Sequence, residues 1–576
     1  MRRILKDRHT TLIVMSVFVG ALAGAANIVF RSSMLFIFDN VFVAGGHLLG
    51  VHDGGFRRLL LPLLPMAGVL LLIPLAYKFP GDIYGYTFHR FLETVNLKGS
   101  ILKARAIVLK TVGAALTIGT GGSAGVEGPI ATVGGTIGSV MGQFFKVSGN
   151  RLKLLVAAGS AGAIAATFNA PIAGVMFAME IVLLGNYELT SFAAIVISSG
   201  IATVVSRAYY GANPAFAVPK YNLVSAYEIP LYMVLGLVVG VLAVLYIRVF
   251  YKVKDAFRNS RIPPLVRPVV GAFIVGSIGV LFPQVLSDGY SFIEQTLAGN
   301  VAAATIIVLV FLKILATSVT LGSGGTGGVF APALFIGAMA GGGFGYVVHW
   351  LFPQVTASSG AYATVGLGAF LAAATHAPLT GIFLLFEMTG NYQIIVPVMM
   401  SAIIGTLLAR RIDEDSIDTV ELTRRGINIH AGQEVAIMGR IKVKDVMNRD
   451  VVRIREDKSL SALVNVMVQR ERFYIPVVDT GDKMVGILSI QDVRPVLFEE
   501  KVKGIVKAGE LATEDVITLR PEDDLNTAME NFAVKDIEEI PVVSGDDSRK
   551  VIGMLRRMDV IAAYKKEVLK REREKF

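Results

Sequence analysis

Long apolar segments recur through the first 410 residues, and they constrain the fold more than any other feature of the sequence. A straight membrane-spanning helix needs about 20 apolar residues. Several segments are shorter, and many of the 60 glycines lie between them, which is typical of interrupted helices around a buried site. We therefore predict an α-helical multi-pass membrane protein. The segments cover about residues 11–30, 57–77, 104–120, 129–146, 153–167, 171–185, 190–209, 229–250, 266–282, 301–320, 329–351, 361–375, 378–388 and 393–409.

Charge divides the chain into two parts. Residues 1–410 contain 26 Lys and Arg and 13 Asp and Glu, whereas residues 411–576 contain 29 and 32. The first part has the charge density of a membrane domain and the second that of a soluble one. The absence of cysteine excludes a disulfide scaffold and a thiolate zinc site. The predicted divisions are a transmembrane domain (1–411), a linker (412–440), two α/β units (441–500 and 501–565) and a charged tail (566–576).

The basic residues predict an orientation in the membrane. The surplus of positive charge is 26 − 13 = 13 in the first part, and the second part carries 29 − 32 = −3. Cytoplasmic loops are enriched in Lys and Arg, which accounts for this surplus better than a nucleic-acid-binding face does. Four basic residues among the first eight indicate a first membrane helix rather than a cleaved signal peptide. We expect cytoplasmic termini, a plasma-membrane location, lipid as a partner and no nucleic-acid partner.

The membrane part contains an internal repeat. Gly119–Pro129 (GTGGSAGVEGP) and Gly322–Pro332 (GSGGTGGVFAP) align at an offset of 203, and Asn169–Gly174 (NAPIAG) matches the segment that starts at His376 (HAPLTG). Glu180 and Glu387 each follow the proline of that second match by nine residues. Chance similarity does not keep two blocks and a glutamate in step. Duplicated membrane halves with short helices typically place the transport site at their interface.

Glu127, in the first glycine-rich block, is the strongest candidate for a functional residue. Pro129 is typical of the first turn of a helix, and a helix N-terminus offers free N–H groups and partial positive charge to an anion. The second copy provides the same backbone without the carboxylate. An ionised Glu127 would then occupy an anion site, and a protonated one would leave it. The alternative interpretation is a helix-capping glutamate near the surface.

Few other ionisable residues lie in the apolar segments, and each is a functional hypothesis because charge at membrane depth is costly. We expect Glu180 and Glu387 to pair with backbone or with a basic residue at the membrane edge. Lys110 either raises the positive potential along an anion path or reaches the interface. His376 is expected to be a packed or loop histidine. Hydrolase and phosphate-loop motifs are absent from the sequence, so we expect no enzyme activity. Between Val270 and Leu408 the Asp, Glu, Lys and Arg residues are Asp288, Glu294, Lys313 and Glu387.

Together, GVEGP, GVFAP, NAPIAG and the segment FEMTGNYQ resemble the CLC family of chloride channels and chloride/proton exchangers. The resemblance implies inverted repeats, a homodimer with one anion path per subunit, and chloride and protons as transported ions. It places Glu127 on the family's gating glutamate. It places the N–H groups of Val329 and Phe330 on the central anion site. The other residues that it implies for anion binding are Gly125, Val126, Gly128, Gly328 and Ala331.

Four departures from the family pattern bear on mechanism. The serine that contacts the anion corresponds to Tyr84, followed by Gly85, and the tyrosine near the end of the membrane domain corresponds to Asp418. Ile181 stands where many exchangers carry a second, proton-relaying glutamate, and Val126 replaces a common basic residue. The further pathway residues are Lys110, Asp418 and Ile181. These departures favour a channel-like or weakly proton-coupled transporter, with a tightly coupled chloride/proton antiporter as the alternative.

The polar C-terminal part resembles a pair of CBS domains. Pro476 and Pro541 align at an offset of 65, and Asp492 and Asp559 at 67. Ser489 and Asp492 match a ribose-binding pattern, and the second copy keeps Asp559. The resemblance implies regulation by an adenine nucleotide, ATP or AMP; the alternative is a purely structural dimerisation module. No other cofactor and no metal is expected.

Two other functions account for less of the sequence. A CBS-bearing Mg²⁺ transporter needs clustered carboxylates, and the membrane part has few. A membrane-anchored nucleotide sensor that transports nothing leaves the two glycine-rich repeats without a role.

Overall fold

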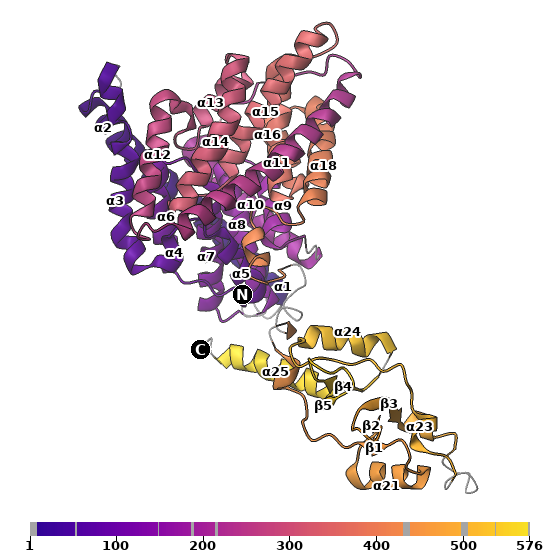
Figure 1. Cartoon of the computed structure of the whole chain (residues 1–576). Coiled ribbons are helices and arrows are strands. Elements are labelled where there is room, and N and C mark those ends of the chain that lie inside the picture. Colours follow the sequence, from indigo (N-terminus) through magenta and orange to yellow (C-terminus); the bar gives the residue numbers. More distant parts are fainter. Residues whose placement is uncertain are drawn as a thin grey trace. The chain divides into compact units, whose positions relative to one another are not determined.

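The chain forms two compact units in the computed structural model, one up to Ile429 and one beyond it. Figure 1 shows helices throughout the first unit and both strands and helices in the second. The structure describes residues 8–51, 55–147, 149–185, 189–212, 217–219, 221–429, 438–439, 441–496, 505–535 and 537–573.

The first half of the membrane unit mixes long and short helices. Its longest helix, α1, has 30 residues, whereas α5 and α9 have 10 and 7. A π-helical turn, η4 (Ala178–Val182), continues α9. The helices are α1 (Arg8–Ile37), α2 (Ala44–Leu48), α3 (Leu63–Lys78), α4 (Pro80–Ile83), α5 (Phe88–Leu97), α6 (Arg105–Gly119), α7 (Glu127–Phe144), α8 (Asn150–Phe168), α9 (Pro171–Phe177) and α10 (Leu189–Tyr210).

The second half has the same mixture. Its longest helix, α11, crosses the unit beside α14 and α18 (Figure 1). The helices are α11 (Glu228–Asn259), α12 (Arg267–Leu281), α13 (Tyr290–Leu297), α14 (Ala303–Ser323), α15 (Phe330–Leu351), α16 (Ser359–Thr375), α17 (Pro378–Thr389), α18 (Ile395–Ile412) and α19 (Val420–Thr423).

Among the described residues, eight helical segments are long and apolar enough to cross a membrane. Four more apolar helices of 10–17 residues are too short for a straight span. The predicted multi-pass fold with short helices is therefore confirmed.

The two glycine-rich blocks lie against each other. Gly125 N donates to Gly328 O at 2.8 Å, and Gly328 N donates to Gly125 O at 2.7 Å, so equivalent residues of the two copies form an antiparallel bridge. Each block leaves its preceding helix through a glycine at the same repeat position, Gly121 with φ 108° and Gly324 with φ 127°. Only glycine adopts such backbone angles readily. The two copies of the repeat predicted from sequence thus meet at equivalent residues.

Glycines also bring the helices of each half into close contact. A Cβ on Gly134 of α7 would lie 2.2 Å from the carbonyl oxygen of Gly159 on α8. In the second half, a Cβ on Gly337 of α15 would lie 2.4 Å from Gly366 O on α16. The backbones therefore touch at equivalent positions of the two halves. This contact explains why the glycine spacing recurs in both copies.

The second unit contains two small sheets. In the first, β1 pairs parallel to β2, and β2 pairs antiparallel to β3 with Val477 opposite Gly486. In the second, β4 and β5 pair antiparallel with Val542 opposite Gly553, the equivalent register. The elements are β1 (Ile454–Arg455), α21 (Leu460–Arg470), β2 (Tyr474–Val478), β3 (Met484–Ser489), α22 (Ile490–Val493), α23 (Ala508–Leu511), α24 (Leu525–Lys535), β4 (Glu539–Val543), β5 (Val551–Arg556) and α25 (Arg557–Arg573).

The two copies in this unit share their cores. Val443, at the start of the first copy, is buried with Leu525 and Leu555 of the second. Ala508, at the start of the second copy, is buried with Leu463 and Leu488 of the first. Each copy therefore completes the core of the other.

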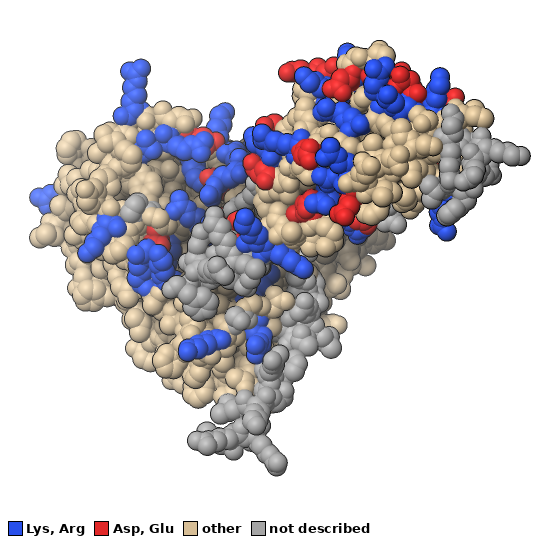
Figure 2. Space-filling model, turned by 90° about the horizontal axis from the view of Figure 1, so that it is seen from below, with Lys and Arg blue, Asp and Glu red and all other residues tan. Residues whose placement is uncertain are grey.

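Charge is distributed unevenly over the surface. Seen from below, basic side chains are widespread and acidic ones gather mainly in one part (Figure 2). The sequence has the same asymmetry, since 32 of the 45 acidic residues follow residue 410.

Candidate functional site

Two helix N-termini meet where the glycine-rich blocks pair. Helix α7 begins at Glu127 and α15 begins at Phe330. The first residues of a helix have N–H groups without intrahelical partners. At these two ends, Ile130 N already donates to Val126 O and Ala333 N to Val329 O, and the prolines have no N–H. The amides at 127–128 and 330–331 therefore remain for a ligand.

The Glu127 carboxylate lies at this point and is fully buried. Its Oε2 accepts a hydrogen bond from Ala331 N of the opposite half at 3.1 Å. Its Oε1 accepts a hydrogen bond from the hydroxyl of Tyr290. A Cβ on Gly125 would lie 2.3 Å from Oε2, so glycine makes room for the carboxylate. The side chain thus takes the position that a small anion would take between the two helix ends. The interpretation as a surface cap is wrong because Glu127 has no exposed surface.

A third helix N-terminus adjoins the site. Helix α5 begins at Phe88, whose Cδ2 lies 4.0 Å from the position of a Cβ on Gly128. Lys110 is buried and donates a hydrogen bond to Thr87 Oγ1, just before α5. It does not reach the interface, and its charge lies beside the start of this helix. Aromatic rings enclose the site: Phe177 lies between Phe88 and Phe330, at centroid distances of 6.2 and 6.0 Å.

Tyr84 does not reach this site. Its hydroxyl donates toward two carbonyl oxygens, Pro264 O at 2.7 Å and Ser323 O at 3.1 Å. A phenol has one proton to donate, so Tyr84 has none left for an anion. The expectation that Tyr84 replaces the anion-contacting serine is therefore corrected. Gly85, with φ 71°, donates to Gly324 O at 3.0 Å and turns the chain toward Tyr86.

Tyr86, two residues after Tyr84, contacts Asp418. Both side chains are buried, and the Tyr86 hydroxyl donates to Asp418 Oδ1. The hydroxyl of Tyr246 on α11 is buried without a hydrogen-bond partner among the described residues. Burial raises the pKa of Asp418, which follows the last membrane helix, to about 6. Tyr86 directly precedes Thr87, so Asp418 is connected to the Glu127 site through the start of α5.

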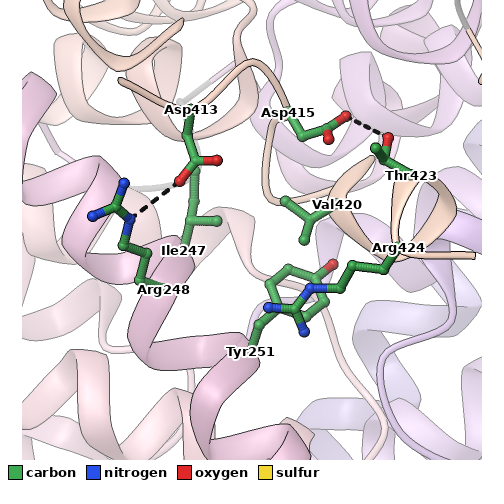
Figure 3. Close-up of a pocket in the computed structure, with 8 residues that line it drawn as sticks. All are labelled: Ile247, Arg248, Tyr251, Asp413, Asp415, Val420, Thr423 and Arg424. Atoms are coloured by element: carbon green, nitrogen blue, oxygen red, sulfur yellow. Dashed lines mark hydrogen bonds and ion pairs between the residues drawn. The ribbon is translucent and has the colours of Figure 1, made fainter. Parts of the chain in front are cut away.

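A cavity of about 250 Å³ lies between α11 and the chain after α18. Tyr251, which lines it, donates to the carbonyl oxygen of Ile417 at 2.8 Å. Figure 3 shows Asp413 paired with Arg248 and Asp415 bound to Thr423, so the charged groups in this view hold the chain after α18 in place. The lining residues are Ile247, Arg248, Tyr251, Asp413, Asp415, Val420, Thr423 and Arg424.

Glu180 and Glu387 stabilise helix N-termini reciprocally. Glu387 accepts from Ile172 N at 2.9 Å and Ala173 N at 2.7 Å at the start of α9. Glu180 accepts from Leu379 N at 3.0 Å and Thr380 N at 2.7 Å at the start of α17. The prediction of structural pairing with backbone is confirmed. Ile181, next to Glu180, is a buried apolar residue. His376 ends α16 in the left-handed region and is buried, which confirms a packed loop histidine.

The predicted nucleotide residues hold local partners. Ser489 Oγ donates to Asp492 Oδ2 at 2.6 Å in the capping box of α22. Asp559 accepts from Arg556 at 2.8 Å. In the part of the chain that the structure describes, no group of three or more His, Asp or Glu is arranged to hold a metal ion.

Tyr290 and Tyr86 are the site residues that the sequence did not indicate. Both lie outside the repeated blocks, and each contacts a carboxylate more than 160 positions away in the chain.

Paired helix N-termini around a carboxylate, in a multi-pass helical unit, define an anion-transporting membrane protein. Residues 68–410 match the family of voltage gated chloride channels, and residues 443–499 and 508–566 match the CBS domain. The chain therefore belongs to the CLC family and carries two CBS domains at its C-terminal end.

Several relatives are similar in sequence. A putative chloride channel protein ClcB-like of Ralstonia nicotianae is 33% identical over 338 residues, which are 58% of this chain and 79% of that protein. The chloride channel protein CLC-f of Arabidopsis thaliana is 30% identical over 542 residues, 81% of this chain and 69% of that protein. The H⁺/Cl⁻ exchange transporter ClcA of Salmonella arizonae is 30% identical over 420 residues, which are 71% of this chain and 88% of that protein.

Solved structures have the same fold. A slow cyanobacterial Cl⁻/H⁺ antiporter has a TM-score of 0.65 at 28% identity and covers 72% of this chain and 97% of its own. A eukaryotic CLC transporter has a TM-score of 0.63 at 19% identity, covering 95% and 97%. The predicted inverted-repeat architecture is confirmed.

Proposed function

We propose that this protein transports chloride through a path in each subunit that Glu127 opens and closes. The observation that carries the proposal is the bond from Ala331 N to the Glu127 carboxylate, which occupies the space between two facing helix N-termini. A helix N-terminus stabilises a carboxylate and a chloride ion for the same reason, namely free N–H groups and partial positive charge. The two therefore compete for one position.

Protonation decides this competition. An ionised Glu127 is held by two hydrogen-bond donors, and a neutral carboxylic acid is held less strongly by groups that favour negative charge. When Glu127 takes up a proton it leaves the site, and an anion enters. Val329 and Phe330 contribute the amides of α15, Gly125, Gly128 and Gly328 allow close approach, and Ala331 donates to the anion as it does to the carboxylate.

Coupling between chloride and protons is weak in this proposal. Ile181 stands where a second, proton-relaying glutamate would be, and it cannot carry a proton. Asp418 is a buried carboxylate that follows the membrane helices. Its bond to Tyr86 connects it to the start of α5. Asp418, ionised, slows anions that approach from its side, because like charges repel.

The test is a liposome assay that follows chloride and protons together. Full-length protein is reconstituted, a chloride gradient is imposed without a proton gradient, and both ions are recorded. We expect chloride flux with little linked proton movement. Proton uptake against its own gradient in a fixed ratio to chloride would instead establish a tightly coupled antiporter, as two of the similar proteins are described. The absence of chloride flux from folded protein would reject transport altogether.

The second unit has a regulatory role in this proposal, in a plasma-membrane homodimer with cytoplasmic termini. CBS domains in general bind adenine nucleotides, and Ser489, Asp492 and Asp559 would contact the ribose after giving up their local partners. Calorimetric titration of the full chain with ATP and with AMP tests this. Saturable binding that also changes chloride flux is expected, and no heat at millimolar nucleotide would leave the CBS pair a structural module.

A further inference from the structure

A buried tyrosine outside both glycine-rich blocks contacts Glu127. Tyr290 is the first residue of α13, and its hydroxyl donates to Oε1 of the carboxylate. Ala331 N donates to the other oxygen, Oε2, so both carboxylate oxygens accept a hydrogen bond. A hydrogen bond to an ionised acceptor is about twice as strong as one between neutral groups. Tyr290 therefore favours the ionised carboxylate in the closed position.

Two ionisable residues at membrane depth fix the loop that presents Tyr290. Lys313 on α14 is fully buried, and its Nζ donates to Val285 O at 2.9 Å and Ser287 O at 3.0 Å. Tyr290 N donates to Asp288 Oδ1 at 3.3 Å. These bonds span the whole turn before α13. Lys313 and Asp288 therefore serve to hold the turn that carries Tyr290.

Tyr290 also borders a cavity of about 260 Å³ that Asn27, Arg31, Val126 and Asp288 help to line. Arg31 lies 23 residues after Arg8 on the same helix, which corresponds to about 35 Å of helix rise. This distance exceeds the hydrocarbon thickness of about 30 Å. The cavity therefore lies toward the membrane face opposite the start of α1, and Tyr290 separates it from the Glu127 carboxylate.

We propose that Tyr290 is a positioning residue that holds the ionised Glu127 carboxylate in the anion site and so sets the pH at which the path opens. The proposal rests on Glu127 as the gate. Other charged groups that face this pair are Asp288 on the same loop and Arg31 on α1, and Lys313 on α14 faces Asp288. All three remain when only the phenol oxygen is removed, so a change at Tyr290 isolates the hydrogen bond.

The experiment compares wild type and Tyr290→Phe in liposomes over pH 4.5–8.5. Without the phenol the ionised carboxylate loses a charge-assisted hydrogen bond, which favours opening by roughly tenfold. We expect chloride flux at pH 7.5 to rise by about that factor and the activation midpoint to move up by about one pH unit. Flux at the acid end should stay unchanged, because Glu127 has already left the site there.

Two comparisons keep the result specific. Tyr346→Phe removes a phenol oxygen that donates to Val301 O at 2.7 Å elsewhere in the same unit, and its profile should match wild type. In a Glu127→Gln background, Tyr290→Phe should have no further effect. An unchanged profile in Tyr290→Phe, with the Glu127 component of the pH dependence lost in Glu127→Gln, would overturn the role of Tyr290 and leave the gate intact. Full pH dependence in Glu127→Gln would reject the gate itself. Elution as a single peak shows that each variant folds.

Discussion

At the scale of single residues, two buried carboxylates share one arrangement. Glu127 accepts a hydrogen bond from Tyr290, and Asp418 accepts one from Tyr86. An ionised carboxylate in apolar surroundings is costly unless donors stabilise it. Each phenol therefore stabilises the charged form of its carboxylate. When the carboxylate is protonated, this stabilisation by the phenol is lost.

The first prediction concerns Asp418, whose pKa burial raises to about 6. The carboxyl is therefore ionised at pH 7.5 and neutral well below pH 6. Tyr86, Tyr246 and Tyr251 face it. In a Glu127→Gln background, chloride flux should still rise as pH falls through 6. Asp418→Asn should abolish that rise and raise flux at pH 7.5 roughly threefold to tenfold, since a charge near the path is removed.

The control for this prediction is Asp415→Asn, on the same segment. Asp415 accepts from the hydroxyls of Thr419 and Thr423 and does not contact Tyr86. Its flux should keep the dependence near pH 6. Persistence of that dependence in Asp418→Asn would show that Asp418 does not face the anion path.

At the scale of helices, backbone contact holds each half together. Gly134 touches Gly159, and Gly337 touches Gly366, at distances that leave no room for a methyl group. The atoms nearest to these glycines belong to the backbone of a packed helix, which cannot move aside at low cost. The same contact in both halves keeps the N-termini of α7 and α15 facing each other.

The prediction at this scale is a loss of stability in Gly134→Ala. The added methyl would lie 2.2 Å from Gly159 O, and forcing it in should cost about 1–3 kcal/mol. The melting temperature in detergent should fall by several degrees. Gly200→Ala on α10 is the matched control: no atom lies within 4 Å of its Cβ position, and alanine in a helix gains about 0.5–1 kcal/mol over glycine. Equal melting temperatures for the two variants would contradict the packing argument.

At the scale of the whole molecule, sequence repetition predicted the architecture well. Both glycine-rich blocks, the paired glutamates and the duplicated C-terminal part are visible as offsets in the chain, and the structure joins the copies. The contacts of Tyr290 and Tyr86 were not predictable, because each depends on where a loop far away in the sequence is placed. Tyr84 was assigned wrongly because its hydroxyl donates to Pro264 O and Ser323 O, which lie 180 and 239 positions away in the chain and are not visible in a local sequence pattern.

The most direct test of the account is the pH dependence of chloride flux in Glu127→Gln liposomes. Glutamine has the shape of the protonated side chain and cannot ionise, so it cannot compete with chloride as a charged group. The account predicts flux at pH 7.5 well above that of wild type at the same pH, with only the Asp418 component of the pH dependence remaining. Glu294 lines the cavity of about 260 Å³ beside Tyr290, and its carboxylate accepts from Ala217 N. Glu294→Gln should therefore retain the wild-type profile. Low flux and unchanged pH dependence in Glu127→Gln would contradict the claim that this carboxylate gates the path.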